Sequence, residues 1–336
     1  MLRIGLLGFG GIGKSAHLPP HLMLTEEGIS KLVAVCDIMP ERFENDIKIN
    51  TGSSSAILPE EVHRYPSFEE MIEKEDLDVI DICLPTFLHK EYTIKALQTG
   101  HHVLCEKPMS LCYEDCVQMC ETAKKMGKKL MVGQCNRFSA PHLLLKKYVD
   151  EKTFGNVRNV LFTRFSTTPD WGWDNWFLDS ARSGGAILDL HIHDIDYSRF
   201  VFGEPLSVSC YTESITSKND VIHSRLIYKD FSATAICDWS RKGMPFETVC
   251  TIAFDKATVT RRGSVVTVAP RNGEAAYEPE ITLVNYYKAE IEAFLKCIIN
   301  DTEPEIRAED SALSVKLVDT LCASAEKNGE IIRFKG

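Results

Sequence analysis

Short apolar runs alternate with helix-period segments through the first third of the chain. Five runs lack regular apolar–polar alternation, which is typical of strands buried on both faces: 2–8, 31–37, 77–85, 101–108 and 129–136. Polar segments with helical periodicity lie between them, such as 69–75 and 89–100, and Gly100 ends the second. This repetition of strand and helix predicts a doubly wound parallel α/β sheet.

The pattern changes after about residue 150. Strand-like segments joined by short turns follow one another at 156–168, 206–215, 224–240 and 247–270, and the third contains a turn at Lys229-Asp230. Two helical segments come last, at 286–300 and 308–328. We therefore expect an α+β domain with a largely antiparallel sheet. Because 336 residues exceed what one core usually holds, we place two domains at 1–133 and 134–336.

Charge and hydropathy exclude several classes of partner. The formal net charge is −10 and no block of Lys or Arg occurs, which argues against nucleic acid. No apolar stretch approaches the roughly 18 residues of a membrane span, and the first strand runs directly into a glycine turn instead of a signal-peptide pattern. We expect a cytoplasmic protein without a membrane partner.

The twelve cysteines are scattered, without a C-x-x-C pair, which favours reduced thiols. Cys112, Cys116 and Cys120 are spaced by four along an expected helix, so they are either zinc ligands or one packed helix face. Three sulfurs on one face cannot complete a tetrahedron alone. We favour packing, and we predict no metal.

The six residues after the first strand have the pattern G-x-G-x-x-G: Gly8, Phe9, Gly10, Gly11, Ile12 and Gly13. A strand before this pattern and a helix after it are typical of a Rossmann dinucleotide-binding domain, in which the helix N-terminus receives the pyrophosphate. Asp37 ends the second strand at the offset of an acid that binds the adenosine ribose. A carboxylate there repels a 2′-phosphate and Ile38 is not an arginine, so NAD is favoured over NADP. A glycine turn with a chance aspartate is the alternative.

Two further motifs carry chemistry. Cys105-Glu106-Lys107-Pro108 stands at the end of a parallel strand, at the edge where open α/β sheets bind ligands, and 184–196 reads GGAILDLHIHDID. Together with the glycine pattern and Asp37, they resemble the Gfo/Idh/MocA family of oxidoreductases over essentially the whole chain. The resemblance implies a second domain with a large open, mostly antiparallel sheet, often buried between subunits. A homodimer or homotetramer formed through this sheet is therefore expected.

The resemblance also implies roles for individual residues. Lys107 matches the family's catalytic lysine, His193 its acid/base residue, and Asp189 shares the face of His193 at helical spacing and orients it. Asp196 is the third polar anchor of that element. Glu106, which with Lys107 and Pro108 matches E-K-P as it stands, and Lys107 are expected to contact the cofactor, and Lys107 also the substrate. Less specific matches add Pro85, Thr86, His89 and Asn136 for the cofactor and Arg137 for the substrate.

Other interpretations of these residues stay open. His191 stands where the family pattern has glycine, and Ala186 where it has a third glycine, so His191 either reaches the substrate or fills the core. Asp189, His191 and His193 could bind a metal only on a strand, where alternate residues share a face. Lys107 could be a solvated surface lysine. Four other histidines have no partner pattern and are taken as structural: His17, His21, His101 and His102.

Residues 170–176 hold three of the four tryptophans beside carboxylate and amide side chains. This composition suits sugars and polyols, whose C–H faces stack on aromatic rings, so we expect Trp173 and Trp176 to contact substrate. Burial of the loop at a subunit contact is the alternative.

These patterns predict an NAD(H)-dependent dehydrogenase or reductase that transfers a hydride between nicotinamide and a sugar, cyclitol or related hydroxyl compound. His193 would take the hydroxyl proton while Lys107 stabilises the developing alkoxide. Two alternatives are a glycosidase-like enzyme that retains NAD and oxidises its substrate transiently, and a non-catalytic nucleotide-sensing regulator on the same fold.

Overall fold

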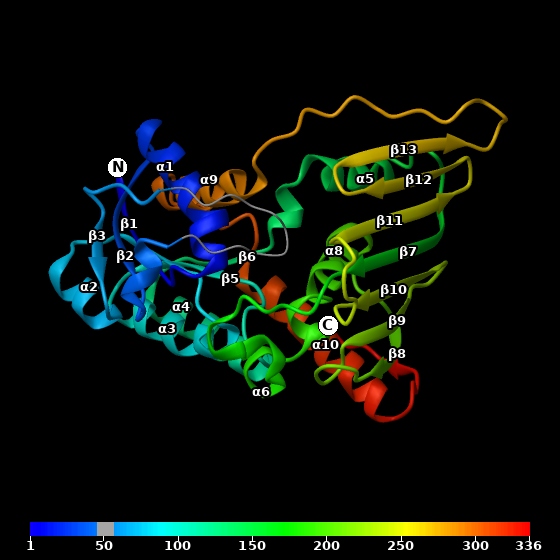
Figure 1. The fold of residues 1–336 in the computed structure, drawn as a ribbon. Helices are drawn as coiled ribbons and strands as arrows, with labels where there is room; N and C mark the ends of the chain where they lie inside the picture. The colour runs from blue at the N-terminus through cyan, green and yellow to red at the C-terminus, as the bar shows by residue number, and fades with distance from the viewer. Residues whose placement is uncertain (46–56) are drawn as a thin grey trace. The chain divides into compact units, whose positions relative to one another are not determined.

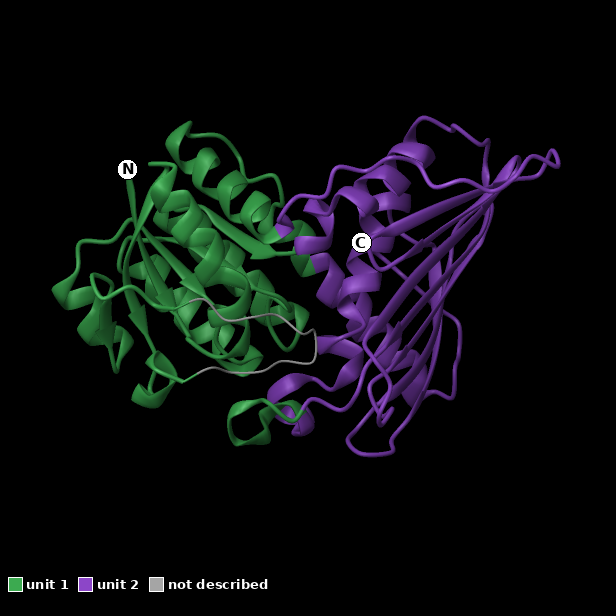
Figure 2. Ribbon diagram, turned by 45° about the horizontal axis from the view of Figure 1, so that its top comes forward, with its two compact units in different colours: residues 1–134, 170–177, 287–312 green, residues 135–169, 178–286, 313–336 purple. Residues whose placement is uncertain are grey.

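The computed structural model describes residues 1–45 and 57–336, which form two compact units (Figures 1 and 2). Unit 1 contains 1–134, 170–177 and 287–312, and unit 2 contains 135–169, 178–286 and 313–336. Two segments that the sequence analysis assigned to the second domain, 170–177 and 287–312, therefore belong to the unit that holds the glycine pattern.

The sheet of unit 1 has six parallel strands in the order β3-β2-β1-β4-β5-β6. Their bounds are β1 Leu2–Leu7, β2 Ser30–Cys36, β3 His63–Tyr65, β4 Val79–Ile82, β5 His102–Glu106 and β6 Leu130–Gly133. Almost every residue of β1, β2, β4, β5 and β6 is buried, so the predicted parallel sheet is confirmed. The short edge strand β3 was not predicted, because three residues with little apolar character carry no periodicity.

Helices cover this sheet on both sides (Figure 1). They are the π-helix η1 Gly13–His17, α1 Leu18–Glu26, the 3₁₀ helix η2 Pro40–Phe43, α2 Phe68–Lys74, α3 Thr86–Gln98, α4 Tyr113–Met126 and α9 Tyr286–Ile299. Helix α4 carries the three spaced cysteines: Cys112 is its N-cap, and the buried thiol of Cys116 donates to the Cys112 carbonyl, 3.3 Å away.

Unit 2 is built on an eight-stranded sheet in the order β13-β12-β11-β7-β10-β9-β8-β14. The strands are β7 Val157–Phe165, β8 Ser207–Glu213, β9 Val221–Ile227, β10 Ser232–Asp238, β11 Glu247–Phe254, β12 Ala257–Arg262, β13 Val265–Pro270 and β14 Ile332–Arg333. Only β7 and β10 pair in parallel, so the predicted antiparallel character is confirmed. Burial alternates along β9 and β10, since one face packs on helices and the other is partly exposed.

The helices of unit 2 include the segment that sequence analysis treated as one helix. Residues 186–202 form two helices, α7 Ala186–Asp189 and α8 Ile192–Phe202. The others are η3 Cys135–Phe138, α5 Ala140–Asp150, η4 Trp173–Leu178, α6 Ser180–Ser183 and α10 Ala308–Glu326, of which η4 and α10 also supply residues to unit 1. Among the helices described, none is long and apolar enough to cross a membrane.

Candidate cofactor and catalytic site

The glycine pattern forms a tight turn between β1 and η1. Gly8 has φ +97°, and a Cβ there would lie 2.7 Å from the Cys83 carbonyl. A Cβ on Gly13 would overlap the carbonyl oxygen of Gly8. Side chains are therefore excluded at both ends of the turn, and η1 begins at Gly13 directly behind it. Near Gly10 the nearest group to an added Cβ is Arg42 Nη1, 3.7 Å away.

Asp37 follows β2 and is bound to this turn. Its Oδ2 accepts the backbone N–H of Phe9 at 2.8 Å, and its Oδ1 accepts that of Met39 at 2.9 Å. The carboxylate is only 4% exposed. It therefore holds the glycine turn and the end of β2 together, in addition to any ribose contact.

Arg42 is a functional candidate that sequence analysis missed. Its Nη1 lies 3.0 Å from Asp37 Oδ2, and it is also the nearest group to a Cβ built on Gly10, at 3.7 Å. The residue next to Asp37 in sequence is not an arginine, but the 3₁₀ turn at Pro40–Phe43 brings one beside the carboxylate. Arg42 follows Asp37 by five residues across a turn, and this spacing was the signal that could have indicated the contact.

The E-K-P motif lies at the carboxyl end of β5, the same sheet edge as the glycine turn after β1. Glu106 Oε2 accepts the backbone N–H of Lys107 at 2.8 Å. His89 on α3 is 1% exposed, and its ring nitrogens lie 2.8 Å from the Pro108 carbonyl and 2.7 Å from the Leu84 carbonyl. His89 thus joins the segments after β4 and β5, while Thr86 at the start of the same helix is also buried.

In the α7–α8 stretch of unit 2, Asp189 and His193 are the polar side chains that keep partial exposure between Gly185 and Asp196. His191, between them, is fully buried, and its Nε2 lies 2.8 Å from Ser224 Oγ on β9. Burial lowers the pKa of His191 to about 4, so it is neutral at pH 7. Because the backbone is helical, Asp189 and His193 do not share a face with His191, and the arrangement needed for a three-residue metal site is missing from this stretch.

Two buried ion pairs hold helix α8 in unit 2. Arg137 on η3 binds both oxygens of Asp196, at 2.8 and 2.6 Å, and Arg164 on β7 binds both oxygens of Asp194, at 2.9 Å each. Asp196 Oδ1 also accepts the Ser314 hydroxyl at 2.8 Å. Arg137, which sequence analysis expected to contact the substrate, is therefore paired with Asp196, the third polar residue of the motif that contains Asp189 and His193.

The tryptophan loop packs on its own aromatic rings. Trp176 stacks on Phe177 with 4.0 Å between ring centroids, and Trp171 meets the same ring edge-on at 4.5 Å. Trp176 is 8% exposed, whereas Trp173 is half-buried. Of the two tryptophans expected to contact substrate, Trp173 is thus the more accessible.

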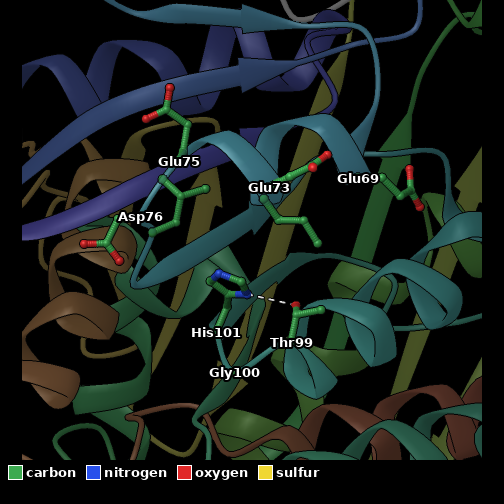
Figure 3. Close-up of a pocket in the computed structure, with 9 residues that line it drawn as sticks. Glu69, Glu73, Glu75, Asp76, Thr99, Gly100 and His101 are labelled. Carbon is green, nitrogen blue, oxygen red and sulfur yellow. Dashed lines mark hydrogen bonds between the residues drawn. The ribbon is translucent and has the colours of Figure 1, made fainter.

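A pocket of about 490 Å³ lies at the opposite edge of the parallel sheet, where the strands begin (Figure 3). Its wall carries four carboxylates and the His101 ring, whose Nδ1 lies 2.9 Å from Thr99 Oγ1; the carboxylates belong to Glu69, Glu73, Glu75 and Asp76. This acidic wall repels phosphate, so the pocket does not suit a dinucleotide.

Sequence comparison identifies the family to which these elements belong. Residues 2–134 match the family described as an oxidoreductase family with an NAD-binding Rossmann fold, and 142–260 match the GFO/IDH/MocA C-terminal domain. The chain belongs to the Gfo/Idh/MocA family. The resemblance inferred from its motifs is confirmed.

Individual members of the Gfo/Idh/MocA family match most of the chain. Myo-inositol 2-dehydrogenase of Thermotoga maritima is 27% identical over 94% of both sequences. D-xylose 1-dehydrogenase (NADP(+)) 2 of Haloferax volcanii is 23% identical over 98% of this chain and 99% of its own. The crystal structure of aldose-aldose oxidoreductase from Caulobacter crescentus superposes with a TM-score of 0.83 at 23% identity, covering 99% of each chain. The fold is therefore shared over the whole length.

Proposed function

We propose that this chain is an NAD(H)-dependent oxidoreductase that transfers a hydride between nicotinamide and a hydroxyl-bearing carbon of a sugar, cyclitol or related polyol. One observation carries the proposal: the glycine turn after β1 and Lys107 after β5 lie at the same edge of one parallel sheet. The names of the relatives support the substrate class. All twelve cysteines are free thiols, which supports action in the cytoplasm.

Each candidate residue has a distinct chemical task in this proposal. The Lys107 ammonium stabilises negative charge on the substrate oxygen, and His193 accepts or returns the hydroxyl proton, oriented by Asp189. Bound NAD supplies the hydride acceptor. The glycine turn, Pro85 and Asn136 are proposed to hold the cofactor, and His89 and Glu106 to fix the segment that carries Lys107.

Exposure divides the residues expected to contact the substrate into two groups. We assign substrate contact to Lys107, Asp189, His193 and Trp173, which are not enclosed in the core. Arg137, His191 and Trp176 are buried against neighbouring side chains, so we assign them a supporting role.

Turnover on a panel of polyols, aldoses and inositols, with NAD and NADP, tests the function. His193→Asn and Lys107→Ala should each lower turnover by roughly 10²–10⁴-fold with NAD affinity retained. If both side chains act on the same substrate oxygen, the double variant should lose far less than the product of the two losses. His63→Asn, which removes an exposed histidine on β3, outside the proposed site, is the matched control. Full turnover in His193→Asn would reject the mechanism.

The same assays separate the two alternatives. A regulator binds the nucleotide but gives no turnover with any compound in the panel. A glycosidase-like enzyme that retains NAD purifies with tightly bound cofactor and consumes substrate without a net change in nicotinamide absorbance.

We also propose that the chain self-associates as a homodimer or homotetramer through the partly exposed face of the unit 2 sheet. Apolar side chains on this face support the proposal, including Leu161 on β7, 39% exposed, and Tyr211 on β8, 60% exposed. Sedimentation equilibrium measures the mass directly, and a monomer at micromolar concentration would contradict this arrangement.

A further inference from the structure

Unit 1 contains a buried cluster of two histidines and an aspartate, His17, His21 and Asp81, that the proposed mechanism does not use. His17 ends η1 and His21 lies one turn further, in α1; both rings contact Asp81 Oδ2 on β4, His17 through Nδ1 and His21 through Nε2, at 2.7 Å each. The other nitrogen of His17, Nε2, lies 3.0 Å from Glu106 Oε1 at the end of β5. The side chains of His17, His21 and Asp81 are at most 1% exposed. Sequence analysis treated both histidines as structural because Asp81 and Glu106 are 60 or more residues away.

The geometry defines the charge of His17. Each of its ring nitrogens faces an oxygen of an acidic side chain, at 2.7 Å for Asp81 and 3.0 Å for Glu106. Ionised carboxylates accept hydrogen bonds but cannot donate them, so with both acids ionised both ring nitrogens carry hydrogen. Burial alone would lower the pKa of His17, but the charge and hydrogen bond of Asp81 raise it well above its ordinary value. His21, Cys83, Glu106 and the Tyr287 ring of α9 complete its surroundings, and burial raises the pKa of the Cys83 thiol to about 12, which keeps it neutral.

Glu106 connects this network to the proposed catalytic segment. While its Oε1 faces His17, its Oε2 accepts the backbone N–H of Lys107 at 2.8 Å. Gly133 on the neighbouring strand leaves room for the carboxylate, since a Cβ there would lie 3.1 Å from Oε1. His17 also ends the helical turn that begins at Gly13. One side chain thus joins the cofactor turn to the residue before Lys107.

A metal ion is the competing interpretation, because ligand atoms of His17, Asp81 and Cys83 lie within 4.8 Å of one another. Zinc held at its usual bond lengths separates tetrahedral N and O ligands by roughly 3.3 Å. The 2.7 Å contacts of Asp81 with both histidines are shorter and have the length of charge-assisted hydrogen bonds. The distances therefore favour protons over a metal between these atoms.

We propose that His17 is a positioning residue for Lys107: its imidazolium ring bridges Asp81 and Glu106, and so holds Glu106 against the Lys107 backbone N–H beside the cofactor turn. The expected effect of His17 on turnover rests on the proposed function. The contact of His17 with Glu106, and of Glu106 with the Lys107 N–H, does not. His17 touches neither substrate nor cofactor in this role.

A double-mutant cycle tests the catalytic consequence. His17→Gln retains one N–H donor arm and loses the charge, so Glu106 is released and turnover should fall by about 10–100-fold, with NAD affinity within about threefold of the wild type. In the Lys107→Ala background the same substitution should cost less than about twofold, because its effect acts through Lys107. His101→Gln removes another buried histidine of unit 1, away from this edge, and should leave turnover unchanged. A merely structural role for His17 gives equal losses in both backgrounds and overturns the proposal.

Two measurements on the whole protein need no turnover. In protein labelled with ¹⁵N-histidine, both ring nitrogens of His17 should stay protonated from pH 6 to 8. In hydrogen exchange, the Lys107 amide should exchange at least about tenfold faster in His17→Gln than in the wild type or His101→Gln, because Glu106 no longer protects it.

These results distinguish the two proposals. If the wild type has no turnover, or if Lys107→Ala remains fully active, the proposed function fails and the exchange result still decides the link between His17 and Lys107. A neutral His17 ring at pH 7, stoichiometric zinc in the purified protein, or an unchanged Lys107 exchange rate would overturn the positioning role.

Discussion

The two units place their candidate residues by different means. In unit 1 the cofactor turn depends on the backbone: strands buried on both faces end at one edge, and glycines at 8 and 13 leave no space for side chains. In unit 2 the candidates Asp189 and His193 lie on α7 and α8. Two arginines distant in sequence hold α8, through the ion pairs Arg137–Asp196 and Arg164–Asp194. A short motif suffices to indicate the first arrangement, while the second depends on which side chains meet.

Two buried histidines, one in each unit, also differ in their partners. His17 in unit 1 lies between two carboxylates and is charged, whereas His191 in unit 2 faces a hydroxyl and is neutral at pH 7. Burial opposes charge in both cases, and only a carboxylate partner outweighs it. Burial of a histidine alone therefore does not indicate its protonation state.

Breaking a buried ion pair of unit 2 should have the largest effect. Asp194→Asn leaves the Arg164 guanidinium, 6% exposed, without its charged partner, and should lower the free energy of unfolding by about 3–5 kcal/mol. Replacing both residues, as Arg164→Met with Asp194→Leu, should recover most of the loss. Urea denaturation measures both values, and a double variant as unstable as Asp194→Asn would show that packing, not charge, dominates.

Adding a Cβ to the glycine turn of unit 1 should have the next largest effect, which is a loss of NAD affinity. Gly8→Ala forces a side chain against the Cys83 carbonyl at φ +97°, and strain of about 1–3 kcal/mol should move the turn and weaken NAD binding about 10–100-fold. Gly28→Ala is the matched control, since Gly28 also has positive φ but no atom within 4 Å of its added Cβ. Calorimetric titration with NAD measures the affinity of both variants. If Gly8→Ala and Gly28→Ala bind NAD equally well, the glycine turn does not form the cofactor site.

Acid should destabilise unit 2 through His191. Its folded pKa, about 4, lies below the ordinary 6.5, so its contribution to stability is complete above pH 6.5 and is lost as the pH falls toward 4. Between pH 7 and 5 this loss amounts to about 2 kcal/mol. His191→Asn should flatten the pH dependence of unfolding by that amount. Ser224→Ala removes only the hydroxyl partner of His191, so the free energy of unfolding should still fall in acid. If His191→Asn shows the same pH dependence of unfolding as the wild type, another group is responsible for it.

Cofactor preference should show the smallest effect. We expect NAD to bind more tightly than NADP, because the Asp37 carboxylate repels a 2′-phosphate. Asp37→Ser should narrow the ratio of the two affinities by about tenfold, close to 1.4 kcal/mol, since Arg42 then loses its carboxylate partner and can receive the phosphate. Adding Arg42→Ala should restore part of the difference, because the 2′-phosphate then loses the cation that receives it, while the repelling carboxylate stays absent. Equal affinities in the wild type would exclude Asp37 as the discriminating group.

The sequence by itself determined the parallel sheet, the glycine turn and the change to an antiparallel sheet, because these depend on periodicity and on residues adjacent in the chain. It did not indicate the return of 170–177 and 287–312 to unit 1, nor the break between α7 and α8. Only the tertiary structure placed His17 between Asp81 and Glu106, and Arg137 on Asp196, because these partners are 59 or more residues apart. The physical reason is that a charged side chain selects its partner by distance and burial in the folded chain, and neither quantity has a period in the sequence.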